Sequence, residues 1–208
     1  MKNTKGIDIL NLMGQGKKPK DVFLGKPLAS LHEFYLTSEI GPNEEYSEWF
    51  DIIRSCSEND VIKLHINCYG GDMFTAIQFM RVLIETDATV VCSVEGACMS
   101  AATMIFLTAD MYEVSEHSMF MFHNYSGGTF GKGGEMFDQL KHERAWSEKI
   151  LRSVYEDFLT PDEITQLLDN KDIWMDGDNA IKRLKVKSQK VKELEAKKKA
   201  KGKKKKED

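Results

Sequence analysis

The chain has 208 residues, 41% of them hydrophobic, which is enough to bury the core of one domain with little room for a second. Its apolar runs are too short to span a membrane, its N-terminus is too polar for a secretory signal, and its four cysteines form no CxxC pair, so we expect a cytoplasmic protein without membrane contact. The net charge is −4, but residues 182–208 hold 14 Lys and Arg against four Asp and Glu, so an acidic body carries a basic tail.

The N-terminal quarter predicts a loose arm followed by a strand and a helix. Residues 1–20 are rich in Lys and Gly, and the folded domain should begin near Asp21. A strand pattern covers 33–37. Residues 44–56 then place large apolar side chains three and four positions apart, as on one face of a helix: Tyr46, Trp49, Phe50 and Ile53.

The next stretch repeats the strand and helix patterns around a glycine pair. Residues 61–67 alternate as a strand that is interrupted by Gly70 and Gly71. Residues 72–85 predict a helix whose apolar face consists of Met73, Ile77, Met80 and Ile84.

A buried strand over 89–96 then leads into a helix that opens with small residues, from Ala97 or Met99. Two short strands are predicted over 111–114 and 119–123. Because strands and helices alternate at roughly 25-residue spacing, we expect an α/β domain with parallel strands joined by crossover helices. Functional groups should gather at the carboxyl ends of those strands.

The last third predicts a projecting arm and a basic tail. Residues 126–134 contain five glycines and cannot form a stable helix, whereas 135–158 predict a long helix with one packed side: Phe137, Leu140, Trp146, Ile150, Val154 and Phe158. Thr160, Pro161 and Glu163 are typical of a helix start, and this helix should end near Asn170.

The chain should close with a small strand over 172–175 and a helical segment over 178–184. We expect 185–208 to be disordered or at most transiently helical, because its lysines repel one another and it offers little apolar surface. Nucleic-acid binding is disfavoured, since no aromatic residues are interleaved with the lysines.

Three residues are candidates for a catalytic triad. Ser100 lies where a strand gives way to a helix N-terminus, a place that favours developing negative charge. His123 ends an apolar strand and Asp172 precedes another, so they could serve as base and orienting acid. The Gly70-Gly71 turn and the N–H of Ala101 could stabilise an oxyanion.

Other residues compete for these roles. Cys98 is an alternative nucleophile, but it comes two residues early and is expected in the core. His65 lies too far before the glycine pair to face Ser100. No group of His, Cys, Asp or Glu has metal-ligand spacing, so we expect neither a metal nor a cofactor. The rivals of Asp172 are Asp169, Asp176 and Asp178.

From about Phe34 to Leu184 the chain resembles the proteolytic subunit of the Clp protease. The segment Ile66-Asn-Cys-Tyr-Gly-Gly71 is similar to that family's Asn-Ser-Pro-Gly-Gly turn, and Gly96-Ala-Cys-Met-Ser100-Ala-Ala to its Gly-x-Ala-Ser-Met-Gly nucleophile turn. Met121-Phe-His123 resembles its Met-Ile-His strand. The Gly-rich segment with the long helix resembles its handle, and Asp172-Ile-Trp-Met175 its aspartate strand.

The resemblance implies a crotonase-like α/β fold of repeated ββα units with a protruding handle helix, and a serine endopeptidase domain over 21–184. It implies the triad Ser100, His123 and Asp172, with oxyanion N–H groups from Gly71 and Ala101. Substrate would lie extended as an added strand. The residues implied to bind it are Gly70, Asp72, Met73, Ser126, Gly127 and Gly128.

The resemblance also implies a homo-oligomer of heptameric rings stacked as a tetradecamer, which encloses the active sites and receives unfolded polypeptide from an AAA+ unfoldase in an ATP-dependent manner. The chain departs from the family pattern at Tyr69, Ala101, Asn124 and Tyr125, none of which removes a catalytic group. Such drift suits a bacteriophage head-maturation-type member. Two alternatives stay open: a catalytically inactive ring subunit or assembly scaffold, and a crotonase-like acyl-CoA enzyme.

Overall fold

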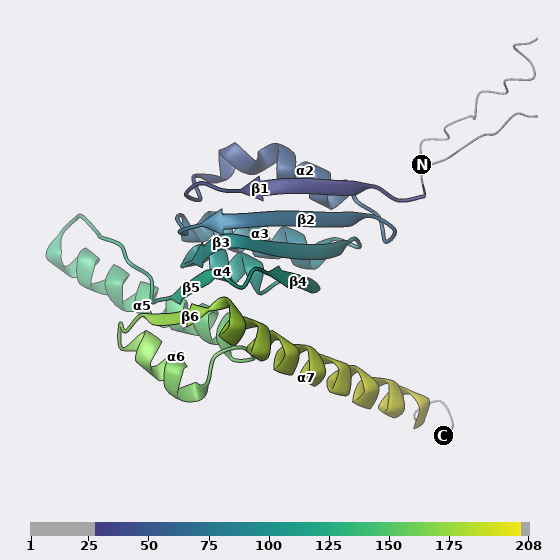
Figure 1. Ribbon diagram of the computed structural model, residues 1–208. Coiled ribbons are helices and arrows are strands. Elements are labelled where there is room, and N and C mark those ends of the chain that lie inside the picture. The colour runs from purple at the N-terminus through teal and green to yellow at the C-terminus, as the bar shows by residue number, and fades with distance from the viewer. Residues whose placement is uncertain (1–27, 205–208) are drawn as a thin grey trace, which may run out of the picture.

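The computed structural model describes residues 28–204 (Figure 1), so the arm predicted for 1–20 and the domain start near Asp21 lie outside the described residues. In chain order the elements are β1 (Leu31–Leu36), the 3-10 helix η1 (Asn43–Tyr46), α2 (Ser47–Ser55), β2 (Val61–Cys68), α3 (Met73–Glu85), β3 (Thr89–Met99), α4 (Ala101–Phe106), β4 (Met111–Val114), β5 (Met119–Phe122), α5 (Gly133–Tyr155), α6 (Pro161–Leu168), β6 (Ile173–Asp176) and α7 (Gly177–Lys204).

One sheet organises the domain. Its order is β1-β2-β3-β5-β6, with β4 paired to β3 beside β5. The pairs from β1 to β5 are parallel, which confirms the α/β architecture, and β6 runs antiparallel to β5. Because β2, β3 and β5 are parallel, the segments that follow them reach the same edge of the sheet. Gly70, Ser100 and His123 follow these three strands directly or closely.

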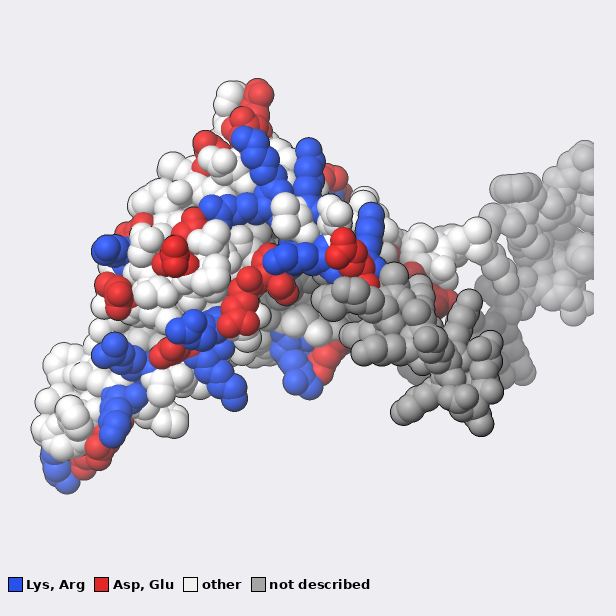
Figure 2. All heavy atoms as spheres, turned by 90° about the horizontal axis from the view of Figure 1, so that it is seen from below, with Lys and Arg blue, Asp and Glu red and all other residues white. Residues whose placement is uncertain are grey.

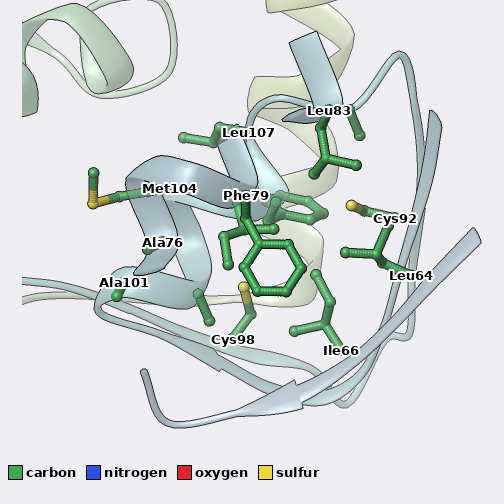
Figure 3. Packing of buried hydrophobic residues seen from close by; sticks show 14 of the residues in the cluster. Leu64, Ile66, Ala76, Phe79, Leu83, Cys92, Cys98, Ala101, Met104 and Leu107 are labelled. Carbon is green, nitrogen blue, oxygen red and sulfur yellow. The ribbon is translucent and has the colours of Figure 1, made fainter. Parts of the chain in front are cut away.

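The main core lies between the sheet and the helices α3 and α4 (Figure 3), and Phe50 and Ile53 of α2 are also buried in it. The predicted apolar face of α3 is partly wrong: Ile84 is 66% exposed, whereas Phe79 and Leu83 are buried. This helix is apolar on two sides, so periodicity alone could not orient it. The Phe79 ring decides the orientation, because it packs edge-on against Tyr46 and Phe50 of the preceding helical segment.

Two predicted boundaries differ in the structure. Strand β3 continues to Met99 rather than giving way to a helix at Ala97, because Cys98 and Met99 still pair with neighbouring strands. The small C-terminal strand begins at Ile173, which leaves Asp172 just before it. The helix start predicted at Thr160 is confirmed: Thr160 Oγ1 accepts from the Glu163 N–H, and the Glu163 carboxylate accepts from the Thr160 N–H.

Helix α5 is confirmed, but only its C-terminal half packs as predicted. The Gly-rich segment and the first turns project from the body (Figure 1), and Phe137 and Leu140 are exposed. The buried residues begin at Ser147 and continue with Leu151 and Tyr155. The apolar spacing in the first half therefore does not mark a face that packs within this chain.

Helix α7 continues to Lys204, past the end predicted at Leu184, so residues 185–204 are helical where we expected disorder or at most a transient helix. Lys, Gln, Glu and Ala favour helix, and propagation from an already packed turn avoids the cost of nucleation. Lys187 fixes the helix to the body, since Nζ donates to the Leu107 carbonyl and to the Tyr112 hydroxyl. On the face in Figure 2, basic and acidic side chains are interspersed among the described residues.

The face of the sheet opposite α3 carries a charged network centred on His65. Its Nδ1 lies 2.5 Å from Glu95 and its Nε2 3.2 Å from Glu33, and its ring stacks on Tyr35. The hydrogen bond to Glu95, and then that to Glu33, raises the pKa of His65 above its usual value, against the opposing effect of burial. A protonated imidazole can donate from both nitrogens to the two carboxylates.

We therefore expect this network to stabilise the fold in acid more than in base. A raised folded-state pKa contributes stability that is complete below the unfolded value of about 6.5 and is lost as the pH rises through the folded value. Glu95→Gln should cost about 0.5–1 kcal/mol at about pH 6, a small figure because Glu95 is half exposed. At about pH 9 the cost should be smaller.

Urea unfolding of both proteins at the two pH values measures this difference. Glu148→Gln is the matched control, because its partner Arg152 stays charged throughout. A Glu95→Gln cost that does not change with pH would mean that Glu95 does not raise the pKa of His65 in the folded protein.

Candidate active site

Ser100 lies in a sharp turn between β3 and α4. Its backbone has φ 53° and ψ −129°, a combination that is strained for a residue with a side chain. Hydrogen bonds hold the turn: the Ser100 N–H donates to the Met121 carbonyl, and the Ser100 carbonyl accepts from both the N–H and the hydroxyl of Thr103. This turn places the Ser100 hydroxyl at the N-terminus of α4, as the sequence indicated.

The glycine pair after β2 allows the chain to pass close to this serine. At Gly70, where φ is 103°, a Cβ atom would lie 2.6 Å from Cβ of Ser100, so no larger residue fits. At Gly71, Ile40 occupies one side of the chain, since its N–H donates to the Gly70 carbonyl and its carbonyl accepts from the Asp72 N–H. In this parallel bridge the Gly71 N–H points away from Ile40, which leaves it available for a ligand.

His123 directly follows β5, and its Nε2 lies 2.5 Å from Oγ of Ser100. These side chains come from positions 23 residues apart and are joined because β5 pairs with the end of β3, where Met99 lies opposite Met121. The N–H of Ala101 is also unused inside the helix, because the first residues of a helix have no intrahelical acceptor. The candidate nucleophile, the candidate base and the two candidate backbone donors thus converge at one edge of the sheet.

Asp172 is close in register but does not contact the histidine. Its side chain is exposed, and among residues 28–204 it forms no hydrogen bond or ion pair with His123. The antiparallel pair β5 and β6 ends with Phe122 opposite Ile173. One further step in this register would place Asp172 opposite His123, at the spacing where cross-strand side chains meet.

A cavity of about 340 Å³ adjoins Ser100 and His123. Gly70, one of the six residues implied to bind substrate, does not line this cavity but packs closely against Ser100. The other five line it: Asp72, Met73, Ser126, Gly127 and Gly128. Both predicted oxyanion donors, Gly71 and Ala101, also line it. Tyr125, one of the departures from the family pattern, lines it too. No sequence pattern indicated the other lining residues, which include Phe74, Met104, His142, Glu143, Trp146, Leu151 and Tyr155.

A buried pair of hydroxyls supports the nucleophile turn from behind. Thr103 Oγ1 lies 2.7 Å from the Ser100 carbonyl and 2.7 Å from the Tyr155 hydroxyl. Because the Thr103 hydroxyl has one proton and donates it to Ser100, the Tyr155 hydroxyl donates in turn. Desolvation raises the pKa of Tyr155, so it keeps that proton at neutral pH. No periodicity could have predicted this contact across 52 residues.

The alternatives for nucleophile and base do not reach the site. Cys98 is fully buried, and burial raises the pKa of its thiol well above the usual value, so no thiolate forms there at neutral pH. His65 lies on the opposite face of the sheet, between Glu33 and Glu95. Among residues 28–204, no cluster of His, Cys, Asp or Glu is arranged to hold a metal ion, and no helix has the length and apolar character to cross a bilayer.

Comparison with known proteins gives matches of two kinds, to a family sequence model and to solved structures. The sequence model of the family described as Clp protease matches residues 43–183. Among solved structures, a mutant of ClpP1 from Listeria monocytogenes superposes with a TM-score of 0.60 at 21% identity, covering 73% of this chain and 86% of that chain. No curated protein sequence matches. The structural match confirms the expected ClpP-like, crotonase-type α/β fold.

Proposed function

The chain belongs to the Clp protease family, and we propose that it is a serine endopeptidase whose reaction is carried out by Ser100, His123 and Asp172. The observation that carries this proposal is the 2.5 Å contact between Ser100 Oγ and His123 Nε2 at the wall of a cavity. Family membership supports a peptidase rather than the acyl-CoA enzyme considered from the sequence.

The geometry supports acyl transfer in two stages. The Ser100 hydroxyl gives its proton to Nε2 of His123 as Oγ attacks the carbonyl carbon of the peptide. The N–H groups of Gly71 and Ala101 donate to the developing oxyanion, which lies at the N-terminus of α4. His123 then protonates the leaving amine, and water hydrolyses the acyl-enzyme by the same route.

An extended peptide fits beside Gly71. One side of this residue is bridged to Ile40, and the side that faces the cavity keeps its backbone groups available for an added strand. Residues 126–128 line the other side of the cavity and could hold the peptide from there. Main-chain hydrogen bonds of this kind require an extended substrate, so a folded protein would first have to be unfolded by a partner. The family resemblance implies an AAA+ unfoldase for this role.

The direct test is labelling with a fluorophosphonate, which reacts with activated serine hydroxyls. We expect one label per chain, located at Ser100 by peptide mass spectrometry, and hydrolysis of a fluorogenic peptide by the same preparation. Absence of both label and hydrolysis would overturn the proposal. It would favour the second candidate, an inactive subunit that keeps the fold, which the missing contact between Asp172 and His123 also favours.

We further propose that the active form is a homo-oligomer, with stacked heptameric rings as the form the family implies. The first half of α5 exposes Phe137 and Leu140 on a projecting arm, and such apolar side chains are commonly covered by a partner surface. Light scattering should give a mass several times the 23.7 kDa of one chain. A stable monomer at micromolar concentration would contradict this expectation.

A further inference from the structure

Two aromatic rings meet at the wall of the candidate active-site cavity. Phe74, in the first turn of α3, stacks on Trp146 of α5 with ring centroids 5.2 Å apart and ring planes inclined by 26°. Both residues line the cavity that contains Ser100 and His123. Phe74 is nevertheless 64% exposed, so most of its ring is available to a ligand rather than buried in the core.

The stack joins the two sides of the cleft. Phe74 lies three residues after Gly71, and its position is fixed because the Asp72 side chain caps α3 by accepting from the Thr75 N–H. Trp146 lies where the projecting part of α5 enters the body, just before the first buried residue, Ser147. The pair therefore links the wall that includes the oxyanion donor to the base of the arm.

The cavity also has an apolar, buried part. Met104, Leu151 and the ring of Tyr155 line it and are almost completely buried. Such a surface accepts an apolar side chain, but it does not by itself distinguish a flat ring from a small group. The exposed aromatic wall adds that distinction, because stacked rings attract a further flat apolar group more strongly than a methyl group.

We propose that Phe74 and Trp146 are specificity-determining residues, which select peptides with a large, flat apolar side chain next to the scissile bond. This inference rests on the proposed peptidase function. The alternative is that the stack only braces α5, in which case its removal would affect large and small side chains equally.

The test uses two peptides of equal length and charge that carry Phe or Ala on the acyl side of the scissile bond. The readout is the ratio of kcat/KM for the Phe peptide to that for the Ala peptide, measured with the full chain. Trp146→Ala should lower this ratio about tenfold, whereas Trp146→Phe should keep it within about twofold. Phe74→Ala should act like Trp146→Ala and serves as the second variant if the latter misfolds.

Tyr35→Ala is the matched control. It also removes a stacked ring that is 56% exposed, but from the opposite face of the sheet, so the ratio should not change. An unchanged ratio in both Trp146→Ala and Phe74→Ala would overturn the inference, as would an equal loss for both peptides.

A binding measurement separates this inference from the proposed function. In the Ser100→Ala background no acyl transfer can occur, so fluorescence anisotropy with the same two peptides, dye-labelled, reports their affinities alone. Adding Trp146→Ala should lower the Phe preference about tenfold there too. If the native chain neither hydrolyses peptides nor reacts with fluorophosphonate, the peptidase assignment fails, and the affinity ratio still decides the role of the aromatic wall.

Discussion

Ser100→Ala is expected to reduce peptide hydrolysis by about 10⁴-fold or more, to near background. The substitution removes the one oxygen that lies 2.5 Å from His123, and no other described hydroxyl or thiol at the site takes its place. The fold should persist, because alanine keeps the Cβ atom and the backbone hydrogen bonds of the turn do not involve Oγ. Initial rates on a fluorogenic peptide and a thermal melt measure the two effects.

Ser153→Ala is the control for this substitution. Its hydroxyl is exposed on α5, donates only to the Ile150 carbonyl and does not line the cavity, so both rate and stability should stay close to native. If Ser100→Ala kept more than about a tenth of the native rate, the nucleophile assignment would be wrong. Cys98 could not replace it, because its thiol is buried and protonated.

The sequence predicted those parts of the fold that arise from local patterns. Residues 61–67 alternate and form β2, and the Thr160 capping box starts α6, because strand alternation and helix capping depend on neighbouring residues. Ser100 could be singled out as the candidate nucleophile for a related reason. A strand that ends in small residues before a helix produces a helix N-terminus at a defined position, and the structure has this turn.

Features that depend on distant contacts could not be predicted in the same way. Periodicity gave α3 the wrong apolar face, because the choice depended on aromatic rings of the preceding helix. The Phe74–Trp146 stack joins residues 72 positions apart, and the hydrogen bond from Tyr155 to Thr103 joins residues 52 apart. The length of α7 depends on a distant contact as well: repulsion between lysines predicts disorder, whereas the helix propensity of lysine and the anchoring contact of Lys187 favour the helix.

Asp172→Asn is expected to lower kcat by at least about 10²-fold, although the exposed Asp172 side chain contacts neither Ser100 nor His123. The reason is its position one residue before Ile173, which pairs with the residue preceding His123. Continued by one step, this register would place the carboxylate next to His123, where it could accept from Nδ1. There it would hold the imidazole tautomer that accepts the serine proton and would stabilise the imidazolium that forms. Steady-state kinetics on a short peptide measures the loss.

Asp169→Asn provides the sharpest comparison, because Asp169 lies on the same connection between α6 and β6 and lines a separate polar cavity beside Asn124. Asp176 is less suitable, since its carboxylate already caps α7 by accepting from the Asn179 N–H. If the loss follows Asp169 instead, the third member of the triad lies three residues before the position that the family resemblance implies. The register that ends at Ile173 must then shift when the site becomes active. If neither carboxylate matters, the exposed position of Asp172 is its working position, and catalysis rests on the Ser100 and His123 pair with the backbone donors of Gly71 and Ala101.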